Sequence, residues 1–144
     1  MVGRYHINPE TAIMKISDWP EPDRLLFEKS MIKSDPFSEE GSRSSCRPIS
    51  NKKVAGGHGR YLTCLKIYHP HVLEYPPEDR IIPDLVKSFL ENLIKVGNKK
   101  TTILDRLNEL YAMAIILAPN KCFRFIKDYE ARIRARMFDE KKPD

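Results

Sequence analysis

Residues 83–119 read PDLVKSFLENLIKVGNKKTTILDRLNELYAMAIILAP, and this stretch decides the fold class. In its first half, apolar side chains recur three or four residues apart, which is typical of one face of an α-helix. Pro83 suits the first turn of that helix and Gly97 suits the left-handed residue that ends it, so residues 83–96 are predicted to be helical. The second half is predicted to form another helix, which ends before Pro119.

Three further helices are predicted around this pair. The sequence DWPEP at 18–22 combines proline with acidic residues as a helix start does, and it precedes a short predicted helix at 22–33. Ser50 is predicted to be the N-cap of a helix that extends to residue 68. A last helix is predicted at 120–138. Residues 34–48 are rich in Ser, Pro and Gly and are predicted to form a loop.

The predicted fold is therefore all-α, a compact bundle of four to five helices. No segment alternates as a β-strand does, and no internal repeat is present. A chain of 144 residues is long enough for one hydrophobic core and too short for two comparable ones. We expect residues 1–18 to form an extended arm, residues 19–138 the helical domain, and residues 139–144 a tail or the start of a linker.

The composition indicates a soluble globular chain, with 41% hydrophobic and 31% charged residues. No apolar run approaches the roughly 18 residues that a membrane-spanning helix requires, and no signal peptide opens the chain. The three cysteines are odd in number and lack CxxC spacing, which argues against a disulfide framework or a zinc site. We expect a cytoplasmic protein with no membrane partner, in which Cys64 and Cys122 serve as small core residues.

Positive charge is concentrated in one window of the chain. Residues 41–73 contain no acidic residue, whereas acids and bases are nearly balanced elsewhere and the net charge is +5. The cations of this window are Arg43, Arg47, Lys52, Lys53, Arg60 and Lys66. Such a concentration is typical of a surface that binds a polyanion, and the alternative is an ordinary solvated surface rich in lysine.

No catalytic or cofactor motif is present in the chain. The histidine, arginine and tyrosine at positions 58, 60 and 61 are neighbours in sequence, but nearly adjacent residues of a helix point in different directions and cannot act together on one substrate. His69 and His71 flank a proline in a predicted loop, and two histidines without a third ligand are weak evidence for a metal ion. We therefore expect no catalytic residue, no cofactor and no metal site.

The three glycines at positions 56, 57 and 59 are unusual inside a predicted helix. Each glycine disfavours a helix interior by about 1 kcal/mol relative to alanine. Either the helix is kinked or interrupted there, or another group approaches its backbone closely. The sequence leaves both alternatives open.

Two polar clusters are candidates for binding phosphate. The first comprises Arg47, Lys52, Lys53 and Arg60, and the second comprises Lys99, Lys100, Thr101, Thr102 and Arg106. In the second cluster, Thr101 or Thr102 is predicted to cap a helix. Lysines and threonines at a helix N-terminus suit an anion, because free backbone N–H groups and the helix dipole point toward it. The alternative for this cluster is ordinary capping with solvated lysines.

Five short motifs follow one another along nearly the whole chain. They are D-W-P-x-x-D-R at 18–24, G-x-G-R-Y-L-x-x-L at 57–65, D-R-I-I-P-D-L-V-K-S-F-L-E-N-L at 79–93, T-T-I-L-D-R-L-N-E-L at 101–110 and L-A-P at 117–119. In this order and spacing, the chain resembles the N-terminal, SAM-like core-binding domain of the tyrosine site-specific recombinases, the phage-integrase family. Phe123 and Phe125 stand where tryptophans are expected in that family.

The resemblance implies a bundle of four or five helices that arches over one face of double-stranded DNA. It also implies that a separate C-terminal domain, expected outside the sequence given, carries the catalytic Arg, Lys, His and Tyr. The residues that match the DNA-facing helices are Lys52, Lys53, His58, Arg60, Lys99, Lys100, Thr101, Thr102 and Arg106. Further implied partners are the other subunits of a recombinase tetramer, and the implied location is the bacterial cytoplasm, in association with the nucleoid.

The expected function is thus a DNA-binding module that positions duplex DNA for site-specific recombination or integration. Phosphate contacts are expected to dominate over base contacts. A first alternative is a helical module that binds an acidic protein. A second is a stand-alone regulator with a helix-turn-helix, in which the turn at 97–100 would precede a reading helix.

Overall fold

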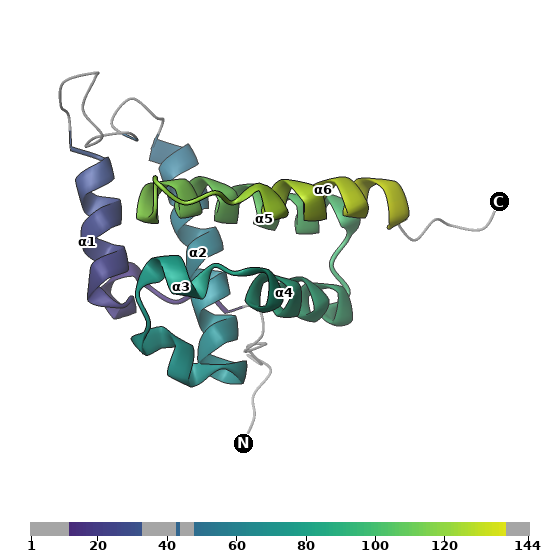
Figure 1. Ribbon diagram of the computed structural model, residues 1–144, viewed down its shortest axis with the longest axis horizontal. Coiled ribbons are helices and arrows are strands. Elements are labelled where there is room, and N and C mark those ends of the chain that lie inside the picture. The colour runs from purple at the N-terminus through teal and green to yellow at the C-terminus, as the bar shows by residue number, and fades with distance from the viewer. Residues whose placement is uncertain (1–11, 33–42, 44–47, 138–144) are drawn as a thin grey trace.

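The computed structural model describes residues 12–32, Arg43 and residues 48–137, and over these residues it is all-α, with no strand. Its helices are η1 (Ile16–Asp18), α1 (Glu21–Ser30), α2 (Pro48–Tyr68), η2 (Pro70–Glu74), α3 (Pro77–Arg80), α4 (Pro83–Val96), α5 (Lys100–Leu117) and α6 (Arg124–Arg136), where η marks a 3-10 helix (Figure 1). The all-α prediction is confirmed, and each of the five predicted helices is present. η2 and the one-turn α3 lie between the second and third predicted helices, where no helix was predicted.

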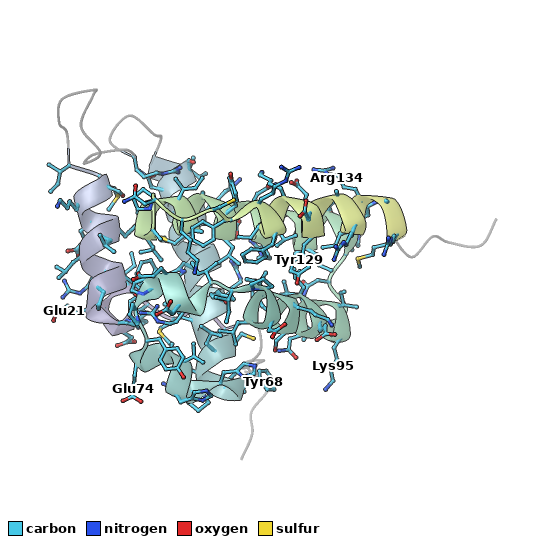
Figure 2. The ribbon with its side chains drawn as sticks, in the orientation of Figure 1. Glu21, Tyr68, Glu74, Lys95, Tyr129 and Arg134 are labelled. Carbon is cyan, nitrogen blue, oxygen red and sulfur yellow. The ribbon has the colours of Figure 1, made fainter. Side chains whose placement is uncertain are left out.

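α5 is the central helix of the bundle, because it contacts each of the other five α-helices. In Figure 1, α5 and α6 run side by side, α4 lies next to α6, and α1 stands at the edge of the molecule. Figure 2 shows the side chains that fill the space between these helices. Among them is Tyr129 of α6, whose hydroxyl donates a hydrogen bond of 3.3 Å to the carbonyl oxygen of Pro83 at the start of α4.

The hydrophobic core draws on nearly every helix of the bundle. Its largest apolar members with almost no exposed surface are Phe27, Tyr61, Leu62, Leu65, Ile81, Phe89, Leu93, Ile103, Leu107, Leu110 and Met113. Cys64 is buried as predicted, but Cys122 is exposed, because it lies in the turn between α5 and α6. Tyr68, the last residue of α2, is 40% exposed and lies outside the core.

Helix ends follow the sequence signals to different degrees. α4 has the predicted bounds, and Gly97 ends it in the left-handed region with φ of 99°. α5 begins one residue before the threonines, with Lys99 as N-cap and no side-chain cap bond, so the predicted threonine cap is wrong. Ser50 lies inside α2, which starts at Pro48, and is likewise not an N-cap. No helix in the described part is long and apolar enough to cross a membrane.

Candidate functional site

A groove of about 910 Å³ lies between the N-terminal segment 13–17, the first half of α2 and the middle of α5. Six cationic residues line it, namely Lys15, Arg43, Lys52, Lys53, Arg60 and Arg106. Only two carboxylates do so, those of Asp105 and Glu109. We call it the cationic groove. Its charge is therefore strongly positive, although the chain as a whole carries only +5.

α2 presents three of these cations to the groove because of their spacing. Lys52 or Lys53, Gly56 and Arg60 recur about four residues apart, so they lie along one side of the helix. Both lysines are exposed. Among the residues that the structure describes, neither ammonium group forms a hydrogen bond or an ion pair. These two predicted site residues thus lie together and are available to a ligand.

Arg60 is only partly exposed, and its guanidinium lies close to that of Arg106. Burial, in the first place, and the neighbouring positive charge of Arg106 lower the pKa of Arg60 from its usual value, while the carboxylate of Glu109 opposes this. The side chain makes no hydrogen bond within the described ranges. Because an arginine stays protonated even with a lowered pKa, Arg60 is a charged donor without an acceptor.

Arg106, by contrast, already has an anionic partner. Its Nη1 donates to both carboxylate oxygens of Glu109, at 2.6 and 2.7 Å, so that most of its charge is matched within α5. Glu109 in turn lies against the backbone of α2 at Gly57. A Cβ atom at Gly57 would come 2.5 Å from the Cβ of Glu109, a distance that no side chain tolerates. Glycine at this position therefore allows α5 to approach α2.

This contact decides between the two alternatives for the glycines. α2 runs without interruption from Pro48 to Tyr68, so the glycines do not break it. At Gly57 and Gly59 other segments of the chain approach its backbone closely. Gly56 differs from them, since an added Cβ would make only an ordinary contact of 3.6 Å with the guanidinium of Arg60.

Four members of the second predicted cluster, Lys99, Lys100, Thr101 and Thr102, lie at the start of α5 outside the lining of the groove, whereas Arg106 lines it. Lys99 and Thr101 are exposed, and Nζ of Lys100 donates a hydrogen bond of 2.8 Å to the carbonyl oxygen of Arg134 in α6. At 1.5 Å of rise per residue, Lys100 is about 9 Å along the helix axis from Arg106. The structure therefore places this cluster beside the groove along α5, whereas the sequence had put both on one binding face.

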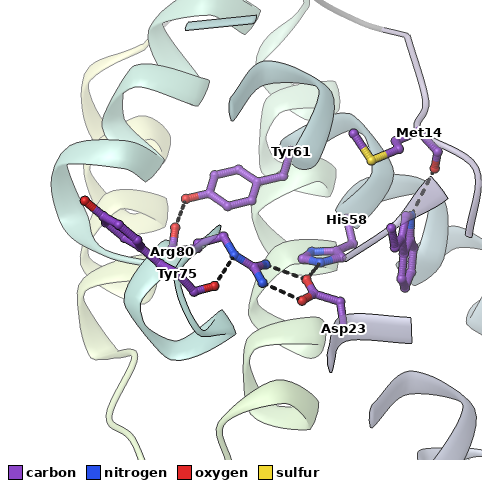
Figure 3. Close-up of polar contacts among 7 residues, drawn as sticks. Met14, Asp23, His58, Tyr61, Tyr75 and Arg80 are labelled. Atoms are coloured by element: carbon purple, nitrogen blue, oxygen red, sulfur yellow. Dashed lines mark hydrogen bonds and ion pairs between the residues drawn. The ribbon is translucent and has the colours of Figure 1, made fainter. Parts of the chain in front are cut away.

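His58 does not belong to the interface, and its assignment to the DNA-facing surface is wrong. It is 1% exposed, and its Nε2 lies 2.7 Å from Oδ2 of Asp23 (Figure 3). Arg80 donates to the same carboxylate from Nη1 and Nη2, at 2.7 and 2.8 Å. The three side chains come from α2, α1 and α3 and form a closed, buried cluster, so they stabilise the fold and cannot reach a ligand.

Further hydrogen bonds connect this cluster to the backbone. Nε of Arg80 donates to the carbonyl oxygen of Tyr75 at 2.9 Å, and the hydroxyl of Tyr61 donates to the carbonyl oxygen of Arg80 at 2.5 Å. Burial by itself would raise the pKa of Asp23, but the hydrogen bonds from His58 and Arg80 outweigh it and hold that pKa below its usual value. Asp23 is therefore ionised.

For His58, burial disfavours the protonated form and lowers the pKa, and the hydrogen bond with Asp23 opposes this effect without cancelling it. A neutral His58 must carry its proton on Nε2, because the ionised carboxylate can only accept a hydrogen bond. Its Nδ1 is then a buried acceptor without a partner among the described residues. Neither His69 nor His71 joins a group of three metal-binding side chains, and the described ranges contain no such group.

Two of the six groove cations, Arg43 and Lys15, were not among the predicted site residues. The guanidinium of Arg43 donates to Oδ1 of Asn51 at 2.9 Å and to Oγ of Ser50 at 3.0 Å. Lys15 reaches the groove from the N-terminal segment, which was expected to be an extended arm. Arg43 belongs to the acid-free window and could have been found there, whereas no sequence signal connects Lys15 with α2. Arg47 lies outside the described residues.

The groove has the charge of a polyanion-binding surface, but its geometry does not identify a family. The recombinase resemblance is based on the order and spacing of sequence motifs. Comparison of the chain with protein-family models, with curated proteins and with solved structures found no match.

Proposed function

We propose that this chain binds the phosphate backbone of duplex DNA through the cationic groove, as a non-catalytic DNA-binding module of the tyrosine-recombinase type. The observation that carries the proposal is the position of Lys52, Lys53 and Arg60. These three cations face one groove without a hydrogen-bonded partner in the described part of the chain. Cations gathered on one surface repel one another, and a polyanion relieves that repulsion.

The chemistry of the groove favours contacts to phosphate over contacts to bases. Lysine ammonium groups act as mobile point charges, and the Arg60 guanidinium can donate two parallel hydrogen bonds to one phosphate. Such contacts position a duplex without reading its sequence. Specificity for a recombination site would then depend largely on other parts of a longer parent protein.

The helix-turn-helix alternative fits the architecture poorly. A recognition helix must expose one face so that it can enter the major groove. α5, which follows the turn after α4, packs against each of the other five α-helices. It carries seven buried residues along its length. We therefore do not propose α5 as a reading helix.

A second candidate is binding of an acidic protein segment, and one observation favours it. Three isoleucines that line the groove are exposed, Ile13 at 49%, Ile16 at 38% and Ile49 at 63%. Exposed aliphatic side chains beside cations suit an amphipathic acidic peptide. DNA phosphates would gain little from the isoleucines, so the two candidates predict different competitors.

The test is an anisotropy titration of the full chain onto a labelled duplex of arbitrary sequence, at salt concentrations from about 50 to about 200 mM. Phosphate contacts from Lys52, Lys53 and Arg60 alone predict a log–log slope of about −2.7 and a roughly 40-fold loss of affinity over this range. The double change Lys52→Glu with Lys53→Glu should abolish binding and leave the thermal unfolding midpoint nearly unchanged, because both side chains are exposed.

Lys66→Glu is the matched control, since Lys66 is an exposed lysine of the same helix, outside the groove. It should change binding much less than the double substitution does. A loss for Lys66→Glu as large as that for the single substitution Lys52→Glu, which changes the net charge equally, would show that only net charge matters and would contradict the groove. If the wild-type chain does not bind duplex DNA but does bind a poly-glutamate peptide, the acidic-partner candidate replaces the DNA proposal.

A further inference from the structure

The N-terminal segment 12–19 lies against the side of α2, and its Met14 makes two backbone hydrogen bonds, one to α2 and one within the segment. The backbone N–H of Met14 donates to the carbonyl oxygen of Gly59 at 3.2 Å. The carbonyl oxygen of Met14 then accepts a hydrogen bond of 3.0 Å from Nε1 of Trp19 (Figure 3). Both polar groups of the Met14 backbone are thus bound, which orients the residues on either side of it.

Gly59 is what allows this segment to lie so close. A Cβ atom at position 59 would come 2.5 Å from the carbonyl oxygen of Met14 and 2.8 Å from Cγ2 of Ile13. The first of these is a backbone atom, so it could not rotate away as the end of a side chain can. Any other residue at position 59 would therefore push the segment off the helix.

The other end of the segment is held by the core. Trp19 is 4% exposed, and its ring packs at 5.6 Å from that of Phe27 and edge-on at 5.0 Å from that of His58. His58 is itself fixed by the ionised carboxylate of Asp23. The buried cluster and the segment are consequently one connected unit, although the cluster has no access to solvent.

Lys15 follows Met14 directly and lines the cationic groove together with Lys52, Lys53 and Arg60. Its backbone is positioned by the contacts above. Its ammonium group has no partner within the described ranges, and the side chain is exposed. The groove thus receives cations from α2 and one further cation from the N-terminal segment.

We propose that Lys15 is a further phosphate-binding residue and that Gly59 and Trp19 are positioning residues that hold it in place. The ligand class is a phosphodiester backbone, so this inference rests on the proposed function. It adds a contact from a segment that was expected to be only an extended arm. It also gives the GxG pattern of α2 a second role besides close helix packing.

The test repeats the anisotropy titration with Lys15→Ala and with Lys66→Ala as the matched control. Lys15→Ala should reduce the steepness of the salt slope by about 0.9, the effect of one phosphate contact. If binding converges near 1 M salt, its affinity should fall roughly 15-fold at 50 mM and roughly fourfold at 200 mM. Lys66→Ala should leave the slope unchanged, since Lys66 is exposed on the same helix but does not line the groove.

Gly59→Ala tests the positioning role. It should flatten the slope by the same amount as Lys15→Ala, and the double variant should lose nothing more than Gly59→Ala alone. Trp19 is the single tryptophan, so its fluorescence reports whether the fold survives. Should Gly59→Ala unfold the chain, Trp19→Phe removes the N–H to Met14 together with part of the buried ring, keeps an aromatic side chain, and should also weaken binding, again without further loss on adding Lys15→Ala.

The outcomes separate this inference from the proposed function. If Lys15→Ala binds like Lys66→Ala while Lys52→Glu with Lys53→Glu still abolishes binding, Lys15 is not a contact and the inference is overturned. If the two losses at Lys15 and Gly59 are additive, the positioning role is overturned and the contact stands. A wild-type chain without salt-dependent binding would remove both the inference and the proposed function.

Discussion

The cluster of Asp23, His58 and Arg80 shows how little the local sequence tells about a buried charge. Asp23 and Arg80 are 57 positions apart, and each stands in a helix start or a short turn where an exposed charge would be ordinary. Removal of one partner from such a buried pair destabilises a protein by about 3–5 kcal/mol, because the other charge stays behind unpaired. Two of the motifs that carry the recombinase resemblance contain these residues, which indicates a structural reason for the motifs.

His58 should make the stability of the fold depend on pH. Its pKa in the folded chain is lower than its usual value of 6.5, so the unfolded chain binds more protons just below that pH. The stabilisation is fully present above pH 6.5 and is lost as the pH falls toward the lowered folded-state value. We expect the free energy of unfolding to fall by up to about 1.4 kcal/mol per pH unit in this window.

Urea unfolding at several pH values between 7.5 and 5 measures this dependence, in comparison with two variants. His58→Gln keeps an N–H donor for Asp23 but cannot titrate, so its stability should vary less with pH. His71→Gln is the control, since His71 is exposed, and it should keep the wild-type dependence. Parallel pH profiles for wild type and His58→Gln would contradict the prediction. Protonation of Asp23, whose pKa is also lowered, should add a loss only at lower pH, below its usual value of 3.8.

Helix geometry explains which of the predicted interface residues lie together in the groove and why His58 does not. Lys52 and Lys53 precede Arg60 by eight and seven residues, about two helical turns, so all three reach the groove together. His58 and Arg60 are two residues apart, about 200° around the helix, so one faces the groove and the other the core. The resemblance placed His58 on a DNA-facing helix, and a match to a helix carries no information about the direction of one side chain.

At the scale of the element, the glycines of α2 permit a comparison of neighbouring positions. Gly56→Ala should stabilise the chain by up to about 1 kcal/mol, because the added Cβ meets only an ordinary contact and alanine favours a helix. Gly57→Ala should instead destabilise it by about 1–3 kcal/mol, since its Cβ would overlap the Cβ of Glu109 and force α5 away. Thermal or urea unfolding of the two variants measures both changes.

The two substitutions should therefore change the free energy of unfolding in opposite directions. Propensity alone would make both substitutions stabilising, so a stabilised Gly57→Ala would mean that α5 does not pack as closely as described. The sequence revealed that the glycines were out of place in a helix, but not which of them mattered. Only the position of α5 decides that, and α5 is more than forty residues further along the chain.

The position of a helix end likewise depends in some cases on neighbouring residues and in others on contacts with distant segments. The end of α4 depends on Gly97 and on bonds within the same turn, from Gly97 N to Ile94 O and from Asn98 N to Leu93 O, so the sequence was sufficient. The start of α5 does not use the hydroxyls of Thr101 and Thr102. Lys100 there contacts α6 instead, an element that local patterns could not place beside it.

At the scale of the whole molecule, α5 connects the cationic groove with the second cluster. Lys99, Thr102 and Arg106 follow one another at three- and four-residue spacing, which puts them along one side of the helix. Along the axis, Lys99 is about 15 Å from Glu109. This is less than half of a duplex turn of roughly 34 Å, so one DNA molecule can contact both places.

Lys99 therefore separates a groove-only site from a longer one. If the duplex follows α5, Lys99→Ala should flatten the salt slope by about 0.9, and Lys52→Ala with Lys99→Ala by about 1.8, because contacts so far apart add independently. Lys99 is chosen over Lys100, whose ammonium group already binds the carbonyl oxygen of Arg134. Lys95→Ala is the control, because Lys95 is an exposed lysine in the last turn of the neighbouring helix α4. A slope that responds to Lys52 but treats Lys99 like Lys95 would confine the DNA to the groove and reduce the second cluster to solvated lysines at a helix start.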